Sequence, residues 1–148
     1  MKETDQDIHA EVYFAIVNSE ISLWSAIDAR FKEAGVPVAM ARYALLRILA
    51  CKPMRLQELA ARCHSGESAT SRIIDRMRKD GLVEKQADKS DGRAVLLRLT
   101  DVGQRIEAQA TAVFNAALKD LFDQHSEAEL QKLLTLLAPF CSPERPNQ

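Results

Sequence analysis

Residues 56–104, LQELAARCHSGESATSRIIDRMRKDGLVEKQADKSDGRAVLLRLTDVGQ, decide the fold of this chain. Two helical segments, 55–63 and 68–80, are separated by the short turn HSGE, and each has its apolar residues on one side. Gly81 stops the second helix as a C-terminal capping residue does. Two short strands, 82–86 and 94–99, follow, joined by the polar tip ADKSDGR. A helix, a tight turn, a second helix and a hairpin together predict a winged helix-turn-helix.

The exposed face of the second helix predicts DNA contact. Short side chains near its start can approach base edges without filling the groove, and Arg72 can bind a guanine or a phosphate. Arg55, Arg62 and Arg78 are further candidates for contacts with DNA phosphates, outside the exposed stripe of this helix that carries Arg76 and Lys79. The competing interpretation is an ordinary solvated helix face. The predicted contacts on this helix are Ser68, Ala69, Ser71, Arg72, Arg76 and Lys79.

The hairpin tip is predicted to enter the minor groove with Arg93, because narrow A·T stretches concentrate negative potential there. Lys89 is expected on the DNA backbone nearby, and Gly92 is expected to hold the turn. The two acids of the tip, Asp88 and Asp91, oppose DNA binding if they stand alone. We expect them to accept backbone N–H groups of the turn, and one of them to pair with Arg93 and aim it.

Long apolar helices flank this core. Residues 5–33 contain no Pro or Gly, carry two apolar stripes and can be capped by Thr4 or Asp5. A helix that is apolar on two faces must bury both, and a second copy of the chain would cover the outer one. Further helices are expected at 38–50, at 101–123, and from the capping box SEAE (126–129) to Pro139.

The predicted fold class is therefore mainly α with a small β-hairpin wing, a winged helix-turn-helix with long N- and C-terminal dimerisation helices. Three parts are expected along the chain. Residues 1–34 would be an N-terminal dimerisation helix, 35–100 a winged helix-turn-helix DNA-binding lobe, and 101–148 the C-terminal dimerisation helices.

Composition agrees with one compact domain or two closely joined halves: 148 residues, 47% hydrophobic and 28% charged. Residues 55–98 contain ten Lys or Arg and seven Asp or Glu, a net +3, against −4 for the rest and −1 overall. A basic middle between acidic ends is a weak indication of a nucleic-acid face. The sequence shows no signal peptide and no apolar run of about 18 residues, so a cytoplasmic location is expected.

The three cysteines, Cys51, Cys63 and Cys141, are few and odd in number, which does not suit a disulfide framework. We expect all three as small core hydrophobes. The alternative is a redox role for Cys63, because oxidation inside the helix-turn-helix would disturb DNA docking. No metal site, cofactor or catalytic constellation is expected, so an enzyme is disfavoured.

A cleft for a small ligand is expected between the dimer seam and the DNA-binding lobes, lined by residues of the first two helices. An arginine beside aromatic side chains suits an aromatic carboxylate, and ordinary core packing is the alternative for each residue. The candidate lining residues are Tyr13, Trp24, Phe31, Met40, Tyr43 and Arg47.

Residues 56–104 resemble the winged helix-turn-helix core of the MarR family of bacterial transcription regulators. The similarity covers about 36 to 105 by motif, and the flanking long helices match the family's dimerisation elements by pattern only. The most specific piece is DKSDGRAVLLRLTDVG (88–103), which is similar to the acidic wing, strand and helix start of that family. The chain departs from it at Gly66 and Glu67, where relatives often have Ser-Arg, and at Ala69 and Thr70. The peroxide-sensing branch of the family carries its reactive cysteine in the first helix, where this chain has none.

The resemblance implies a homodimer, built by the first and last helices, that binds a near-palindromic DNA operator and is not an enzyme. We therefore expect a homodimeric DNA-binding transcriptional regulator, a repressor released from its operator by a small ligand such as an aromatic acid. The alternatives are a winged-helix protein-interaction module and a thiol-based redox-responsive regulator.

Overall fold

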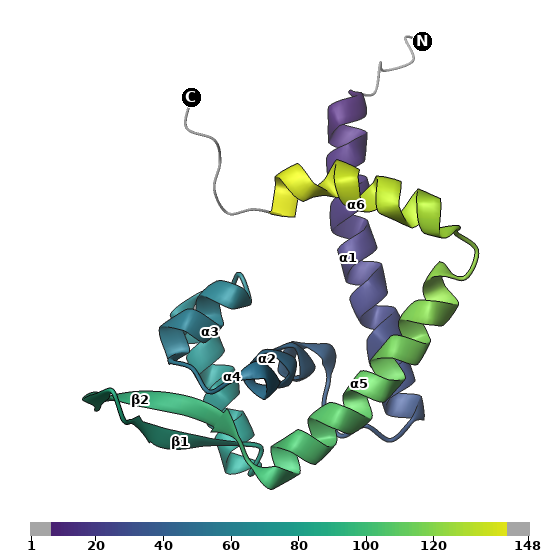
Figure 1. Cartoon of the computed structure of the whole chain (residues 1–148). Coiled ribbons are helices and arrows are strands. Elements are labelled where there is room, and N and C mark those ends of the chain that lie inside the picture. The colour runs from purple at the N-terminus through teal and green to yellow at the C-terminus, as the bar shows by residue number, and fades with distance from the viewer. Residues whose placement is uncertain (1–6, 142–148) are drawn as a thin grey trace, which may run out of the picture. The chain divides into compact units, whose positions relative to one another are not determined.

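The computed structural model describes residues 7–141 and confirms the predicted fold class (Figure 1). Over these residues the order is helix, helix, short helix, helix, two-stranded hairpin, long helix and helix. The bounds are α1 Ile8–Glu33, α2 Met40–Cys51, α3 Leu56–Arg62, α4 Glu67–Lys79, β1 Val83–Asp88, β2 Asp91–Leu99, α5 Asp101–Phe122 and α6 Glu127–Cys141.

The chain divides into two compact units, Met1–Asn115 and Ala116–Gln148, so the boundary falls inside α5. The first unit holds α1 to β2 and most of α5. The second holds the last turns of α5 and all of α6. No helix within residues 7–141 is long and apolar enough to cross a bilayer.

Helix α1 begins three residues later than its sequence pattern predicts. Asp7 is the N-cap, and its side chain accepts the His9 backbone N–H at 3.0 Å. The predicted caps, Thr4 and Asp5, lie outside the described residues. At the other end Gly35 takes a left-handed conformation (φ 69°), which lets the Val36 N–H return to the Phe31 carbonyl at 2.8 Å. This turn directs the chain into α2.

The core of the first unit is made by one side of each helix. Leu46 of α2, Leu59 of α3 and Met77 of α4 are completely buried. Thr70 is the only polar residue buried with them among those described, and its hydroxyl donates to the Gly66 carbonyl at 3.0 Å. The helix-turn-helix therefore closes around apolar side chains with its buried hydroxyl satisfied.

The hairpin is longer than predicted and its turn is tighter. Strands β1 and β2 extend to Asp88 and from Asp91, which leaves only residues 89–90 between them. Gly92 lies inside β2 and is not among the glycines with positive φ, so it does not hold the turn as expected. The turn is held instead by hydrogen bonds from the Ser90 N–H and hydroxyl to the Asp88 carboxylate.

The strand register shifts beside the turn. Asp88 pairs with Asp91, while the preceding residue, Ala87, pairs with Val95. Residues 92–94 of β2 therefore have no partner in the ladder and form a bulge. Such a bulge turns side chains away from the regular alternation of a strand, and Arg93 lies in it.

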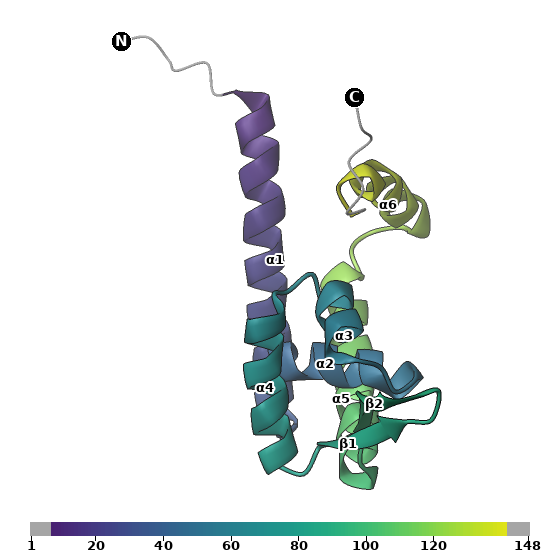
Figure 2. The ribbon, with the colours of Figure 1, turned by 90° about the vertical axis from the view of Figure 1, so that its left-hand side faces the viewer.

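Helix α4 is joined to the hairpin and to α5 by a close backbone contact. Gly81 ends α4 with φ 74°, as predicted, and its carbonyl accepts the Thr100 hydroxyl at 2.6 Å. Thr100 in turn caps α5 by accepting the Gly103 N–H at 3.0 Å. A Cβ on Gly103 would lie 2.0 Å from the Leu82 carbonyl oxygen, so this position requires glycine. Figure 2 shows β1 leaving α4 toward the start of α5.

The second unit confirms the predicted capping box of α6. The Ser126 N–H donates to Glu129 at 2.8 Å, and the Glu129 N–H donates to the Ser126 hydroxyl at 3.3 Å. The helix does not end at Pro139, as expected, but continues to Cys141. Proline has a helical φ and removes only the hydrogen bond to the residue four positions before it, so the last turn is retained.

Candidate nucleic-acid interface

Helix α4 exposes its N-terminal half to solvent, together with a basic stripe formed by Arg72, Arg76 and Lys79. Gly66 is the N-cap and makes no side-chain hydrogen bond to the helix, so the first backbone N–H groups are available to an anion. The buried side chains Thr70, Ile74 and Met77 fix the helix from the opposite face. Of the predicted DNA contacts on α4, Ser71 is half-buried, and the exposed ones are Ser68, Ala69, Arg72, Arg76 and Lys79.

The basic stripe of α4 is electrostatically unengaged. Over residues 7–141, the structure shows no ion pair for Arg72, Arg76 or Lys79. The neighbouring charges are paired in other directions: Arg78 lies 3.8 Å from Asp75, and Asp80 is 2.6 Å from Arg42 of α2. Three exposed cations on one helix face thus remain available to phosphates or bases.

The hairpin adds two exposed cations beyond the helices. Lys89 is in the two-residue turn and Arg93 is in the bulge of β2. The Arg93 backbone N–H donates to Oδ1 of Asp91 at 3.2 Å. Figure 1 shows the hairpin extending away from α3 and α4, as a wing does.

The carboxylate of Asp88 is held by several donors. Its Oδ1 accepts the Ser90 hydroxyl at 2.7 Å and the Ser90 N–H at 2.9 Å, and its Oδ2 lies 3.1 Å from Arg55. Hydrogen bonds from the Ser90 side chain and backbone, followed by that from Arg55, lower the pKa of Asp88 to about 2. The carboxylate is therefore ionised at neutral pH.

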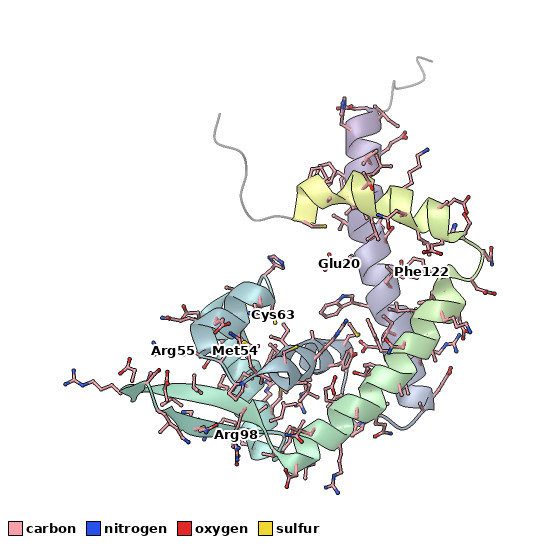
Figure 3. The ribbon with its side chains drawn as sticks, viewed as in Figure 1. Glu20, Met54, Arg55, Cys63, Arg98 and Phe122 are labelled. Atoms are coloured by element: carbon pink, nitrogen blue, oxygen red, sulfur yellow. The ribbon has the colours of Figure 1, made fainter. Side chains whose placement is uncertain are left out.

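Arg55 also reaches the second wing acid, with its Nη2 3.3 Å from Oδ2 of Asp91. The two acids thus hold the turn backbone as the sequence predicts, but the arginine that pairs with them is Arg55 and not the Arg93 side chain. Figure 3 shows Met54 and Arg55 beside the hairpin. Sequence reasoning missed the pairing because 33 residues separate Arg55 from Asp88.

The predicted ligand residues separate into two groups. Phe31 and Tyr43 are buried, with ring centroids 5.4 Å apart, and Met40 is also buried. Phe114 of α5, which the sequence analysis did not include, lies 5.1 Å from Tyr43 and 5.4 Å from the Arg47 guanidinium. Tyr13 does not join them: it is 63% exposed and packs on Phe14, and Trp24 is 39% exposed.

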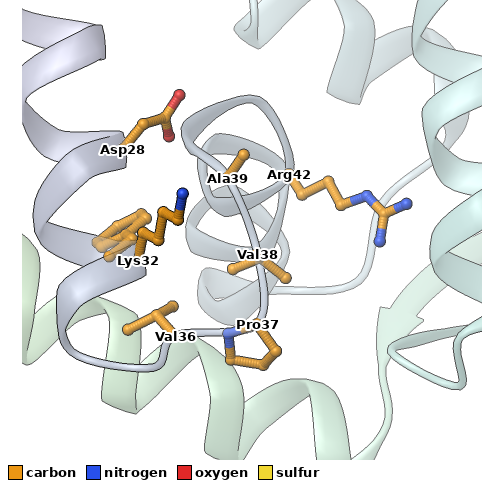
Figure 4. Close-up of a pocket in the computed structure, with 8 residues that line it drawn as sticks. Asp28, Lys32, Val36, Pro37, Val38, Ala39 and Arg42 are labelled. Atoms are coloured by element: carbon orange, nitrogen blue, oxygen red, sulfur yellow. The ribbon is translucent and has the colours of Figure 1, made fainter.

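A cavity of about 450 Å³ lies between the end of α1 and the start of α2 (Figure 4). Phe31 is the one predicted ligand residue that lines it. Its charged lining residues are Asp28, Lys32 and Arg42, and Asp28 accepts the Met40 N–H at 2.6 Å. The other lining residues are Val36, Pro37, Val38 and Ala39.

The cysteines are not core residues as expected. Cys51 and Cys141 are exposed, and Cys63 is half-buried. Burial raises the pKa of the Cys63 thiol. Because the thiolate is the reactive form, this environment does not favour the redox alternative at Cys63.

Comparison with known proteins finds a family match within the winged helix-turn-helix lobe. A model of the MarR family matches residues 38–95. The uncharacterized HTH-type transcriptional regulator YsmB of Bacillus subtilis is 32% identical over 77 residues, which are 52% of this chain and 53% of that protein. The chain thus matches about half the length of this curated relative.

Solved structures extend the likeness of fold to nearly the whole chain. CouR from Rhodococcus jostii bound to p-coumaroyl-CoA superposes with a TM-score of 0.80 at 21% identity, covering 97% of this chain and 100% of that one. A mutant of Escherichia coli MarR complexed with operator DNA superposes with a TM-score of 0.79 at 20% identity, covering 96% and 100%. The flanking helices predicted from sequence therefore belong to the same fold as the lobe.

Proposed function

We propose that this chain is a DNA-binding transcriptional regulator, because a model of the MarR family matches residues 38–95, which form the winged helix-turn-helix lobe. The observation that carries the proposal is the set of five exposed cations on α4 and the hairpin: Arg72, Arg76, Lys79, Lys89 and Arg93. The family consists of regulators that bind DNA rather than enzymes, so no catalytic activity is assigned.

In the proposed complex α4 lies in the major groove. Ser68, Ala69, Ser71 and Arg72 face the base edges near the start of the helix, where side chains are short. Arg76, Lys79 and Lys89 bind phosphates and fix the register. Arg93, exposed in the bulge of β2, enters the adjacent minor groove, where narrow A·T stretches concentrate negative potential.

We further propose that the regulator is a homodimer. Apolar side chains of α1 such as Tyr13, Phe14 and Ile21 are about 60% exposed, and a second copy would cover them. The three-part division of the chain follows: 1–34 and 101–148 for dimerisation, 35–100 for DNA. Two-fold symmetry then sets the two α4 helices about 34 Å apart, one DNA turn, on a palindromic operator in the cytoplasm.

Release by a small ligand completes the proposal. CouR, whose fold this chain shares, has been solved with p-coumaroyl-CoA, an aromatic acyl compound. Here Phe31, Tyr43 and Phe114 form an aromatic cluster and Arg47 lies over one of its rings. An aromatic acid that displaced part of this cluster would shift the lobe relative to the dimer contacts and weaken simultaneous binding of both half-sites. Repression is the simplest regulatory outcome.

The test is fluorescence anisotropy with a labelled duplex from the promoter region of the chain's own gene. Arg93→Ala is expected to weaken binding about tenfold, in keeping with the loss of one groove contact. Lys52→Ala, at an exposed lysine before α3 whose partner is Glu58 and which is not among the predicted DNA contacts, is the control and should bind as the parent does. Equal binding by Arg93→Ala would remove the wing role.

Salt dependence separates this function from a protein-interaction module. Binding through phosphates weakens steeply with salt, with a slope of about −0.9 per phosphate contact, whereas a protein interface shows no such slope. No binding to any duplex at low salt would favour the interaction module.

A further inference from the structure

The wing poses an electrostatic problem for the proposed function. Two carboxylates, Asp88 and Asp91, flank Lys89 and lie within five residues of Arg93, the side chain proposed to enter the minor groove. Each would repel phosphates if it stood alone. The structure balances them with one cation from another part of the chain, because Nη2 of Arg55 lies 3.1 Å from Asp88 and 3.3 Å from Asp91.

The two carboxylates divide their oxygens in the same way. Oδ1 of Asp88 accepts the Ser90 donors, and Oδ1 of Asp91 accepts the Arg93 N–H. Oδ2 of both acids binds Arg55. One oxygen of each acid therefore shapes the wing backbone, while the other is fixed to a residue outside the wing.

The bulge makes this second anchor necessary. Arg93 lies in the segment 92–94, which has no partner in the ladder, so strand pairing does not fix its backbone. The hydrogen bond from its N–H to Asp91 does, and Asp91 is itself held by Arg55. The orientation of Arg93 is thus linked to Arg55 through a single carboxylate.

Arg55 is itself well placed by the backbone. The preceding residue, Met54, is buried and forms an antiparallel bridge with Leu97 of β2, with hydrogen bonds of 3.1 and 2.8 Å. This bridge fixes the start of α3 against the base of the hairpin. The Arg55 side chain then reaches Asp88 and Asp91, on either side of the turn.

We infer, on the basis of the proposed function, that Arg55 is a positioning residue for DNA binding: it holds Asp88 and Asp91 and thereby orients the wing arginine, Arg93. Its role is not that of a phosphate contact. An exposed ion pair adds little to stability. Its effect here is to neutralise the wing acids and to restrain the unpaired segment.

The first experiment uses the free full-length protein and needs no DNA. Amide hydrogen exchange of residues 88–94 is measured by NMR for the parent, Arg55→Ala and Arg62→Ala. Arg62 is the matched control, since it is an exposed arginine of α3 whose partner is Glu58 rather than the wing. Arg55→Ala is expected to speed exchange at the Ser90 and Arg93 amides about tenfold, with no change for Arg62→Ala.

The second experiment measures anisotropy with the promoter duplex over a series of salt concentrations. Arg55→Ala is expected to bind about three- to tenfold more weakly with an unchanged salt slope. Adding Asp88→Asn and Asp91→Asn to that variant is expected to restore most of the affinity. The repelling charges are then gone, and asparagine can still accept the turn N–H groups.

The outcomes separate the two proposals. Unchanged exchange in Arg55→Ala would overturn the positioning role. The positioning role would also be overturned if Arg55→Ala had a salt slope smaller by about 0.9 and the asparagine substitutions did not restore its affinity for DNA. That is the result expected for a phosphate contact. If the parent bound no duplex, the DNA-binding function would fail, while the exchange data would still decide whether Arg55 orders the wing.

Discussion

The winged helix-turn-helix lobe and the outer part of α1 differ in the burial of similar apolar side chains. In the lobe Leu46, Leu59 and Met77 are completely buried within one chain. On α1 Phe14 is 59% exposed and Ile21 is 63% exposed, although they belong to an uninterrupted helix. The lobe thus has a buried core within one chain, whereas these side chains of α1 are left exposed in it. Substitutions in the two regions should therefore affect different measurements.

The largest effect is expected at the closest contact of the lobe. Gly103→Ala would place a Cβ 2.0 Å from the Leu82 carbonyl oxygen, between two backbone segments that cannot move independently. We expect the free energy of unfolding to fall by about 3 kcal/mol or more, measured by urea denaturation.

Gly66→Ala is the matched control for that substitution. Gly66 has an ordinary negative φ and open space where the Cβ would be, so only the N-cap preference for glycine over alanine, about 1 kcal/mol or less, is at stake. Equal losses in the two variants would mean that the junction of α4, β1 and α5 is looser than the structure shows.

The next largest effect concerns the region that is incomplete in one chain. Ile21→Asp would place a charge on the exposed apolar face of α1. In a homodimer the symmetry repeats this charge, and we expect the dimer dissociation constant to rise about a hundredfold by analytical ultracentrifugation. Val95→Asp, at a 48% exposed valine of the hairpin, should leave the dimer intact. A monomeric parent would contradict the proposed dimer directly.

The order of elements was predictable from sequence because each is encoded by neighbouring residues. The apolar spacing of α4, the stop at Gly81 and the capping box at Ser126 are local signals, and the structure confirms them. Element ends were less predictable. The sequence of α1 is compatible with a start at several residues, and a proline near a C-terminus does not always end a helix.

The side-chain contacts of the candidate site and of the aromatic cluster were not predictable, because they join residues far apart in the sequence. The pairing of Arg55 with the wing acids spans 33 residues or more, and the contact of Tyr43 with Phe114 joins α2 to α5. The exposure of Cys51 could not be read from residue type, since free cysteine is usually buried. Tyr13 was grouped with Tyr43 as an aromatic residue, but the two lie in different environments.

Those two tyrosines allow the same substitution in both environments. Tyr43 is 1% exposed, and its hydroxyl lies 3.0 Å from that of Thr111. Tyr43→Phe is expected to lower the free energy of unfolding by about 1 kcal/mol, the usual net value of a hydrogen bond. Tyr13→Phe on exposed α1 should change it by less than about 0.5 kcal/mol. A thermal melt of each variant gives the comparison, and a reversed order would contradict the assignment of the two environments.

The smallest effect is expected at the edge of the lobe, in the acid titration of the wing. The pKa of Asp88 is lowered from its ordinary 3.8 to about 2, so its ionised form favours the folded hairpin. This contribution is fully present above about pH 4 and is lost as the pH falls toward 2, because protonation removes the acceptor of Ser90 and Arg55.

The side-chain carboxyl shift of Asp88 in an NMR titration should therefore have its midpoint near pH 2, and faster exchange at the Ser90 amide should accompany it. In Asp88→Asn the exchange at this amide should no longer change between pH 4 and pH 2, beyond the intrinsic effect of pH on exchange. A midpoint near the ordinary value would mean that Ser90 and Arg55 do not hold the carboxylate in solution. The wing would then lack the internal restraint that the buried core gives to the rest of the lobe.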